Sequence, residues 1–463
     1  MTSKVLPAHE AWTDTVVGVL GLGRSGRGAV ALLERHGAQA IAFDDRSPAD
    51  LPGDVVAELA EWGVEFRAAR DDVRGTVSVL DALVVSPGVP SEHPLVRAAE
   101  QRGTSVIGEL ELASRRARGR ILAVTGTNGK STTVSLVHAI LRQAGHDAVL
   151  VGNIGTAVSD HVEEVDENGL LVIECSSFQL ERVEHFAPAV AAVLNLAPDH
   201  LDRYPSFEAY GEAKRNILRA STPSTAYVYP VDQAPMNQWA EDTPARRAGF
   251  ARDRAENTVT WIEDGWIVRR SEAGPERVLA LDTIPLVGGH NQMNVLAAVA
   301  MVHDLDLDPG GIAEAVAGFR GLPHRAVTVD TDDGRTWIDD SKATNVHAAT
   351  ATLRGLSGRV VALFGGRGKG EDYTPLADHS DRLRVAVCFG EEGQVVAEAI
   401  GDRVRCITCA DMRTALSRAC QLAEVGDTVL LSPACASFDE FGSFAERGEV
   451  FQEWVRTHVG GAS

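Results

Sequence analysis

Residues 125–133 read TGTNGKSTT, and this stretch decides the fold of the chain. An apolar run at 121–124 precedes it, and residues 131–143 after it have the composition of a helix. A glycine-rich turn between a strand and a helix binds polyphosphates, because its backbone N–H groups and the helix N-terminus point at the anion. In that geometry Lys130 would reach the β- and γ-phosphates, and the Ser131 hydroxyl would ligate Mg²⁺. The sequence therefore predicts a phosphate-binding loop.

One departure from the common G-x-x-x-x-G-K-[ST] loop leaves an alternative open. That pattern has glycine at the position where this chain has Val124. A glycine-rich turn without function is the other interpretation of the stretch. The lysine–serine pair directly at the start of the expected helix favours the phosphate loop.

Apolar strand-like runs alternate with helix-like stretches along the whole chain. This alternation predicts an α/β fold with parallel sheets. The 463 residues exceed what one hydrophobic core holds, which is about 250–300 residues. The length alone predicts two or three domains. The order of segments along the chain suggests three, which we place at 1–115, 116–321 and 322–463.

The first segment begins with a strand–turn–helix–strand pattern. We expect strands at 16–20, 40–43 and 82–85 and a helix at 28–36. The turn at 21–26 reads GLGRSG, which matches G-x-G-x-x-G, and Asp44 follows the second strand. By itself this pattern suggests dinucleotide binding, although any nucleotide or sugar phosphate could use the same turn. The basic stretch 115–120 is expected to be a solvated helix end and linker.

In the second segment, polar residues follow two expected strands, at 170–173 and 190–194. Ligands of open parallel sheets bind beyond the carboxyl ends of the strands. Glu174 could hold Mg²⁺ there, or could be a helix cap or salt-bridge residue. Asn195 and His200 lie in a second polar cluster, where a metal or nucleotide role competes with a packed or surface histidine.

The rest of this segment departs from the alternation of strands and helices. Two β-rich runs within 258–269 flank Asp264-Gly265, which predicts a small antiparallel insertion. A helix at 291–302 is expected to close the segment.

The third segment is again predicted to be α/β. We expect strands at 360–364, 385–389 and 428–431 and a helix at 412–423. Three loops follow apolar runs and read DSKATN (340–345), GGRGKG (365–370) and SPACAS (432–437). Their two lysines and several hydroxyls could clamp a small dicarboxylate. Solvated surface loops are the alternative for each loop taken alone.

Composition excludes several classes of protein. The formal net charge of -21 argues against a nucleic-acid binder, which needs a basic face. No run approaches the ~20 apolar residues of a membrane span, and the first residues lack an apolar signal core. We expect a soluble, cytoplasmic protein without membrane insertion. A monomer is expected as well, although composition does not bear on it. The six cysteines include one C-x-x-C at 406–409, for which buried reduced thiols are favoured over zinc or redox chemistry.

Taken in order, these motifs resemble those of the Mur ligase family. The family's loop T-G-T-N-G-K-[ST]-T is present at 125–132, which accounts for the valine at 124. Other matching stretches are ECSSFQL (174–180), DHLDRY (199–204), GLPHR (321–325), DSKATN (340–345) and LSPACASF (431–438). They resemble the branch that adds D-glutamate to UDP-N-acetylmuramoyl-L-alanine, and the resemblance covers essentially the whole chain.

The resemblance implies an ATP-dependent ligase that works through an acyl phosphate and releases ADP and phosphate. It implies a role in peptidoglycan precursor synthesis, and so in cell-wall biogenesis, cell shape and cell division. A Rossmann-like N-terminal domain would bind the UDP-sugar, the central P-loop domain ATP, and a Rossmann-like C-terminal domain the amino acid. The G-x-G-x-x-G turn would then serve the uridine nucleotide instead of NAD.

The resemblance also implies roles for particular residues. Those expected at the UDP-substrate are Arg24, Ser25, Asp44, Asp45, Arg46, Ser86 and Asn153. Those expected at ATP are Gly126, Thr127, Asn128, Gly129, Lys130, Ser131, Thr132, Asn291, Asn294, His324, Arg325 and Asp340. Those expected at D-glutamate are Lys342, Thr344, Lys369, Ser437 and Phe438. Two Mg²⁺ sites would use Ser131, Glu174, His200 and Lys214, the last as a carbamate, and Lys130, Glu174, His200 and Lys214 would be catalytic.

Three alternatives remain open from the sequence. A sibling ligase, such as a folate-type glutamate ligase, would use another amino acid or acceptor, and the motifs at 340–345 and 431–438 argue against it. A nucleotide-binding regulatory protein would not need Glu174, His200 and Lys214 together. A nicotinamide-dependent oxidoreductase would rest on the turn at 21–26 alone.

Overall fold

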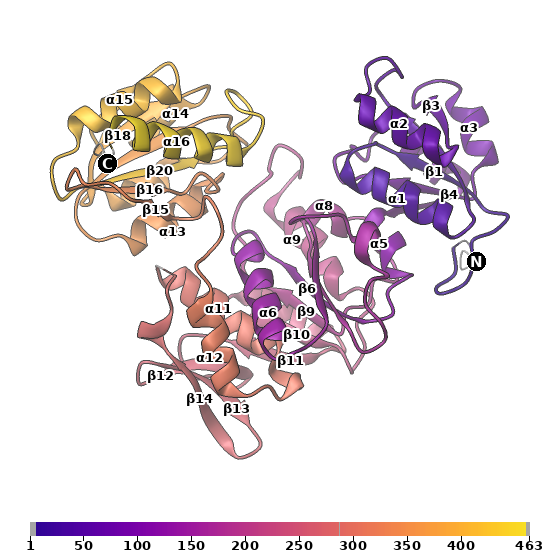
Figure 1. Cartoon of the computed structure of the whole chain (residues 1–463), viewed down its shortest axis with the longest axis horizontal. Helices are drawn as coiled ribbons and strands as arrows, with labels where there is room; N and C mark the ends of the chain where they lie inside the picture. The colour runs from indigo at the N-terminus through magenta and orange to yellow at the C-terminus, as the bar shows by residue number, and fades with distance from the viewer. Residues whose placement is uncertain (1–5, 287, 460–463) are drawn as a thin grey trace.

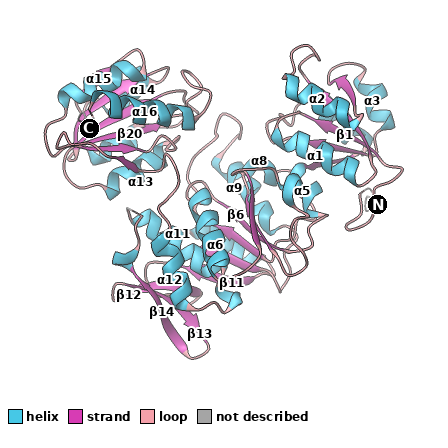
Figure 2. Ribbon diagram, in the orientation of Figure 1, coloured by secondary structure: helices cyan, strands magenta, loops and turns pink. Residues whose placement is uncertain are grey.

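The structure is a computed structural model that describes residues 6–286 and 288–459. The chain forms three sheets in three successive lobes (Figure 1). In this view the first and third lobes both lie above the middle lobe. Helices pack against each sheet (Figure 2), so the predicted α/β fold is confirmed.

The first sheet has five parallel strands in the order β3-β2-β1-β4-β5. The strands are β1 (Val16–Leu20), β2 (Gln39–Asp44), β3 (Glu65–Ala68), β4 (Ala82–Val85) and β5 (Ser105–Gly108). Helix α1 (Arg24–Arg35) begins inside the glycine turn, four residues before the helix predicted there. The third glycine of that turn, Gly26, cannot carry a side chain, because a Cβ would lie 1.9 Å from the Gly21 oxygen.

The middle sheet has nine strands in the order β14-β13-β12-β11-β10-β9-β6-β8-β7. The parallel part consists of β6 (Arg120–Thr125), β7 (Ala148–Gly152), β8 (Leu170–Glu174), β9 (Val190–Val193), β10 (Ala226–Pro230) and β11 (Arg246–Phe250). Strand β6 lies inside this part, and its residues 121–125 are all buried. Full burial of each Leu, Val or Ile side chain contributes about 1.5–3 kcal/mol, so the strand before the glycine loop is firmly held.

The predicted antiparallel hairpin is present and extends the edge of this sheet. Strands β12 (Thr258–Glu263) and β13 (Trp266–Ser271) pair antiparallel around Asp264-Gly265. A third strand that the sequence did not suggest, β14 (Gly274–Ala280), pairs with β13. Because β12 also pairs with β11 in parallel, the insertion continues the main sheet.

Three helices cover one face of the middle sheet: α6 (Lys130–Gln143), α11 (Gly289–Met301) and α12 (Pro309–Gly318). Their apolar residues share one core with Leu122 and Val124 of β6. The other face of β6, through Ile121 and Ala123, belongs to a core that continues into the first lobe. The glycine loop is therefore fixed from both faces of the sheet.

The third sheet has the order β15-β16-β20-β17-β18-β19. Its strands are β15 (Val327–Val329), β16 (Thr336–Asp339), β17 (Val360–Gly365), β18 (Leu383–Phe389), β19 (Cys406–Thr408) and β20 (Thr428–Ala434). All pairs are parallel except β15 with β16. The carboxyl ends of β16, β17 and β20 carry the three polar loops expected to bind a ligand.

The basic stretch 115–120 differs from the prediction. Helix α5 (Glu109–Ser114) does end before it, but Arg115 is half-buried and Arg116 is only 8% exposed. Arg115 pairs with Glu111 at 3.0 Å, and Arg116 donates to the Glu10 oxygen and lies over the Trp12 ring. The prediction of a solvated linker is wrong for Arg115 and Arg116, because their partners lie up to about a hundred residues away in the sequence. Arg118 and Arg120 are exposed, as expected.

No disulfide joins the six cysteines. The predicted burial holds for Cys175, Cys388 and Cys435, whereas Cys406, Cys409 and Cys420 are half-buried. Within the described part of the chain, no helix combines the length and the apolar character that crossing a bilayer requires.

Candidate functional site

The glycine loop between β6 and α6 has the geometry of an anion site. Lys130 folds back over the loop, and its Nζ donates to the Gly126 and Thr127 oxygens at 2.8 Å each. Gly129 has φ +84°, and a Cβ there would lie 2.3 Å from Asn294 Oδ1 on α11. A glycine is therefore required both by the turn and by the close approach of α11.

The loop after β9 holds the glycine loop in place. Asn195 accepts from the Asn128 N–H at 2.8 Å and donates back to the Asn128 oxygen at 2.9 Å. Thr127 Oγ1 donates to the Ala197 oxygen and accepts from its N–H. These paired bonds fix the N–H groups that would face a phosphate.

A cavity of about 430 Å³ opens beside this loop and is lined by residues of the middle and third lobes. Predicted residues that line it are Thr127, Asn128, Gly129, Lys130, Ser131, Asn153, Glu174, His200, Lys214, Arg325, Lys342, Thr344, Lys369, Ser437 and Phe438. Apart from position 4, the sequence has lysine only at 130, 214, 342 and 369, and all four lysines line this cavity. The only carboxylates that line it among the described residues are Glu174 and Asp199. A chain of net charge -21 thus concentrates four of its five lysines around one cavity.

Glu174, at the end of β8, is placed to hold a cation. It is 2% exposed, and its Oε1 accepts from Asn153 Nδ2 at 2.8 Å. Its buried Oε2 has no hydrogen-bond partner among the described residues, which fits a divalent ion as the absent partner. Within residues 6–286 and 288–459, no group of three His, Cys, Asp or Glu side chains could hold a metal ion by itself. Such an ion would need further oxygen ligands, such as Ser131 and phosphate oxygens.

Helix α9 (Phe207–Arg215) brings a buried lysine to the same cavity. Tyr210 and Lys214 lie one turn apart, and Lys214 Nζ lies 4.5 Å from the centre of the Tyr210 ring. Lys214 is 1% exposed and donates to the Gly126 oxygen at 2.9 Å. Burial and the nearby Lys130 lower the pKa of Lys214 well below its ordinary value. A neutral amine is a nucleophile, so this lysine has the chemistry that carbamate formation requires.

His200 also lies near Tyr210, with ring centroids 6.3 Å apart. Burial lowers the pKa of His200 to about 4, so the ring is neutral near pH 7 and can ligate a metal. The backbone of His200 has φ +56°, a conformation that residues other than glycine rarely adopt. Such strain is concentrated at functional sites.

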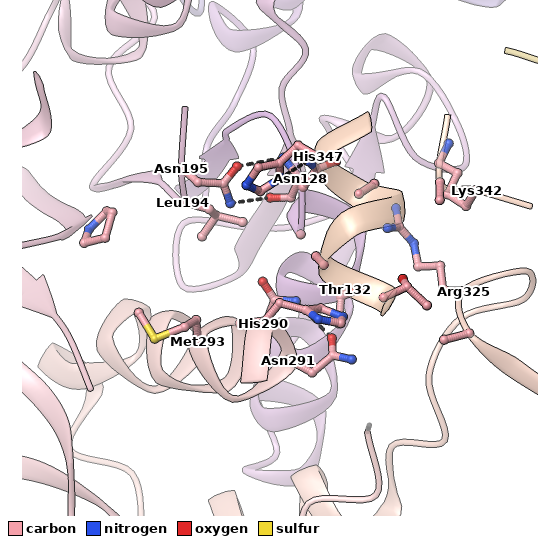
Figure 3. A pocket seen from close by; sticks show the side chains of 18 of the residues that line it. Asn128, Thr132, Leu194, Asn195, His290, Asn291, Met293, Arg325, Lys342 and His347 are labelled. Atoms are coloured by element: carbon pink, nitrogen blue, oxygen red, sulfur yellow. Dashed lines mark hydrogen bonds between the residues drawn. The ribbon is translucent and has the colours of Figure 1, made fainter. Parts of the chain in front are cut away.

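A second cavity, of about 270 Å³, shares Asn128 and Gly129 of the glycine loop with the first (Figure 3). Predicted residues that line it are Asn128, Gly129, Thr132, Asn291, Asn294, Arg325, Asp340 and Lys342. Its apolar walls include Leu194, Phe250 and Met293. In Figure 3, His290, Asn291 and Thr132 lie together, away from Asn128, Asn195 and His347. A flat base with a polar edge fits such a pocket next to a phosphate loop.

The turn before β15 connects the two cavities. Arg325 lies between His324 and Ala326, which both have positive φ, and its Nη2 donates to Ser131 Oγ at 2.8 Å. His324 itself lines neither cavity, because its Nδ1 lies 2.6 Å from Asp339 Oδ2. Asp340 accepts from Thr352 and Ser432, and burial raises its pKa to about 6.

A third cavity, of about 400 Å³, lies between the first and middle lobes. Of the residues predicted for a nucleotide-linked substrate, Arg24, Ser25, Asp44, Ser86 and Asn153 line it. Asp45 and Arg46 do not. Asp45 pairs with Arg70 and His93, and Arg46 donates twice to Asp44. Because Asn153 also lines the cavity beside the glycine loop, the two spaces meet at this residue.

Several residues of the site carried no separate prediction. Asp199, Asn345 and His347 connect the middle and third lobes at the glycine loop. Arg447, on α16 (Phe444–His458), is completely buried and donates to the backbone oxygens of Ser341, Cys435 and Ala436. It thereby joins two of the three polar loops. The cluster at 199–202 gave a signal for Asp199, but Arg447 lies 106 residues from Ser341 and gave none.

Family models match three parts of the chain. The Mur ligase MurD-like N-terminal domain matches residues 15–108, the Mur ligase middle domain 124–302, and the Mur ligase glutamate ligase domain 324–435.

Curated relatives match almost the full length. A protein of Acidobacterium capsulatum named UDP-N-acetylmuramoylalanine--D-glutamate ligase is 38% identical over 448 residues, covering 96% of this chain and 97% of its own. A protein of the same name from Salinibacter ruber is 38% identical over 453 residues, covering 95% and 97%.

Solved structures share the fold at low identity. A pseudomurein peptide ligase type C from Methanothermus fervidus has a TM-score of 0.60 at 15% identity, covering 96% of this chain and 100% of its own. MurF ligase from Thermotoga maritima, in complex with ADP, has a TM-score of 0.58 at 16% identity, covering 98% of each chain.

Proposed function

The chain belongs to the Mur ligase family, and on that premise we propose that it joins D-glutamate to UDP-N-acetylmuramoyl-L-alanine with the energy of ATP. Full-length relatives with this name support the choice of substrates. The observation that carries the proposal is the cavity in which a phosphate loop, four lysines and the polar loops of the third lobe meet. Such a cavity suits a reaction between several anions.

The chemical problem is that a carboxylate is a poor electrophile. In the proposed reaction the alanyl carboxylate takes the γ-phosphoryl group of ATP, which gives an acyl phosphate and ADP. The amine of D-glutamate then attacks the acyl carbon, and phosphate leaves as the amide forms. Lys130 and the loop N–H groups would stabilise negative charge as it develops on the transferred group.

Mg²⁺ is a suitable partner for Glu174 Oε2, which is buried without a hydrogen bond among the described residues. Held by Ser131 and Glu174, the ion would neutralise phosphate charge. A second ion would be held by His200 and a carbamate on Lys214. The cavity beside Asn291, Asn294 and Arg325 would take the nucleotide. Positioning and charge stabilisation would supply most of the rate enhancement.

The three polar loops would bind the amino acid. Lys342, Thr344, Lys369, Ser437 and Phe438 all line the cavity beside the phosphate loop. The cavity between the first and middle lobes would take the uridine nucleotide, next to Arg24, Ser25, Asp44 and Ser86. The shared residue Asn153 supports a single substrate that runs from one cavity to the other.

The broader setting is part of the same proposal. The domains would be 1–115, 116–321 and 322–463, each with its own ligand. A monomer in the cytoplasm would make a peptidoglycan precursor there, and the enzyme would thereby serve cell-wall growth, cell shape and cell division.

The proposal is tested by leaving out one substrate at a time. With all three substrates and Mg²⁺, we expect steady release of phosphate. Without the UDP-substrate or without D-glutamate, release is expected to fall on the order of 10²-fold, because the γ-phosphoryl group lacks its acceptor or the acyl phosphate stays protected from water. A phosphate-release assay measures this. Rapid ATP hydrolysis with Mg²⁺ alone would contradict the ligase.

The proposed role of Lys342 predicts that kcat/KM for D-glutamate depends on pH. Burial and the nearby Arg325 lower the pKa of Lys342 to about 8, so its charge is present below that pH and lost above it. If Lys342 binds an anion, kcat/KM for D-glutamate is expected to fall as pH rises through about 8, since kcat/KM reports the free enzyme. Lys342→Arg keeps its charge in this range and is expected to move the fall to higher pH. The same alkaline fall in both proteins would argue against this role for Lys342.

A further inference from the structure

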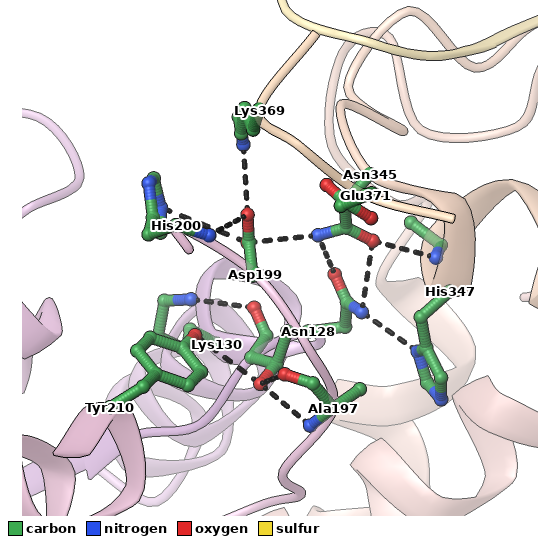
Figure 4. Close-up of polar contacts among 12 residues, drawn as sticks. Asn128, Lys130, Ala197, Asp199, His200, Tyr210, Asn345, His347, Lys369 and Glu371 are labelled. Carbon is green, nitrogen blue, oxygen red and sulfur yellow. Dashed lines mark hydrogen bonds and ion pairs between the residues drawn. The ribbon is translucent and has the colours of Figure 1, made fainter. Parts of the chain in front are cut away.

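One buried ion pair connects the middle and third lobes. Asp199 lies in the loop after β9, and Lys369 lies in the loop after β17. Lys369 Nζ lies 3.0 Å from Asp199 Oδ1, and the two side chains are only 13% and 7% exposed (Figure 4). Asn345 Nδ2 also donates to Asp199 Oδ2 at 3.0 Å. A single carboxylate of the middle lobe thus binds two side chains of the third lobe.

The cavity around this pair has more positively charged than negatively charged side chains. The cavity that it lines contains four lysines and Arg325 but, among the described residues, only two carboxylates. Glu174 already accepts from Asn153 and lies at the end of β8, beside the expected metal. Asp199 is therefore the carboxylate that faces the polar loops of the third lobe. D-glutamate has two carboxylates and one ammonium group. The lysines and Arg325 can pair with its carboxylates, whereas Asp199 is the protein carboxylate placed to pair with its ammonium group.

We propose that D-glutamate inserts between Asp199 and Lys369 and replaces their ion pair. Its ammonium group would bind Asp199, and one of its carboxylates would bind Lys369. This inference rests on the proposed function. Both protein charges are already desolvated, and the exchange replaces one buried ion pair by two charge-assisted pairs. In the absence of the amino acid, the pair keeps the two charges satisfied. Asp199 is then the residue that recognises the amino group and sets specificity for an amino acid over a simple diacid.

Glutarate, which is D-glutamate without its amino group, provides the test. For Asp199→Asn we expect the KM for D-glutamate to rise about 10- to 100-fold, the usual range for loss of a hydrogen bond to a charged group. The inhibition constant of glutarate is expected to stay the same or to fall, because Lys369 no longer has Asp199 as a competing partner. Weaker binding of D-glutamate without weaker binding of glutarate is the expected signature, since a purely structural role would weaken both.

Matched variants separate the possible causes. Asp202→Asn makes the same change on an exposed residue of the same loop and is expected to resemble the wild type for both ligands. Lys369→Met is expected to weaken D-glutamate and glutarate to a similar extent. Asp199→Glu keeps the charge and is expected to recover most of the preference for D-glutamate. If Asp199→Asn turns over too slowly, calorimetric titration of both ligands, with the UDP-substrate and a non-hydrolysable ATP analogue present, gives the same comparison.

The outcomes are distinct. Equal weakening of D-glutamate and glutarate in Asp199→Asn, or unchanged preference for D-glutamate, would overturn the inference. If the wild type shows no turnover with D-glutamate at all, the proposed function itself fails, and this result is obtained before any variant is made.

Discussion

Replacing Lys130 by alanine is expected to reduce turnover on the order of 10³-fold. The Nζ of Lys130 lies over the glycine loop, bound to the Gly126 and Thr127 oxygens, and Glu174 and Asp199 lie near enough to affect its pKa. In the proposed reaction it would lie where the charge of the transferred phosphoryl group develops. Removal of one such preorganised donor commonly costs about 10²–10³-fold in kcat, and a charged donor belongs at the upper end. Steady-state phosphate release measures the effect.

Arg142→Ala is a matched control for that variant. Arg142 lies near the other end of α6, its side chain is 56% exposed, and it forms a 3.7 Å ion pair with Asp147. Such exposed pairs contribute about 0–1 kcal/mol to stability, so activity near the wild-type level is expected. Thermal unfolding of Lys130→Ala shows whether the fold survives. A folded Lys130→Ala protein with wild-type turnover would refute the proposed phosphate loop.

The second large effect is expected at Lys214. If this lysine carries a carbamate that supports a metal ion, Lys214→Ala should lose activity on the order of 10²-fold, as changes around metal sites commonly do. The amine reacts with CO₂ to give the carbamate and one proton, and the lowered pKa of Lys214 favours the neutral amine that this step needs. Solution NMR of protein equilibrated with ¹³C-bicarbonate is expected to show one carbamate carbon.

Two further variants make that signal specific. Lys130→Ala should keep the carbamate signal although it loses turnover, whereas Lys214→Ala should lose both. Acetate or formate is expected to restore part of the activity of Lys214→Ala by supplying a carboxylate beside the metal. Absence of the labelled carbon together with full activity in CO₂-free buffer would rule out the carbamate.

The phosphate loop could be predicted from sequence because all its signals are local. A buried strand, two glycines and a lysine–serine pair follow one another within residues 121–133, and each has a direct structural meaning. The hairpin at Asp264-Gly265 was predictable for the same reason. Strand β14 (Gly274–Ala280) was not, because its glycine, proline and charged residues have low strand propensity and its position depends on pairing with β13.

Contacts between distant parts of the chain explain what the sequence could not show. The 3.0 Å bond between Asp199 and Asn345 spans 146 residues, and no local pattern indicates which side chains meet across two lobes. The basic stretch at 115–120 looked solvated for the same reason, since the partners of Arg116 are Glu10 and Trp12. The resemblance identified the residue types at the site, and the structure shows which of them share a cavity.

One measurement tests the central proposal most directly. The protein is incubated with ATP, Mg²⁺, UDP-N-acetylmuramoyl-L-alanine and one amino acid at a time, and the nucleotide-linked product is identified by mass spectrometry. We predict a product heavier by one glutamate residue with D-glutamate, and none with L-glutamate, L-alanine or D-alanine. Formation of a product with another amino acid, or of none with D-glutamate, would contradict the assignment.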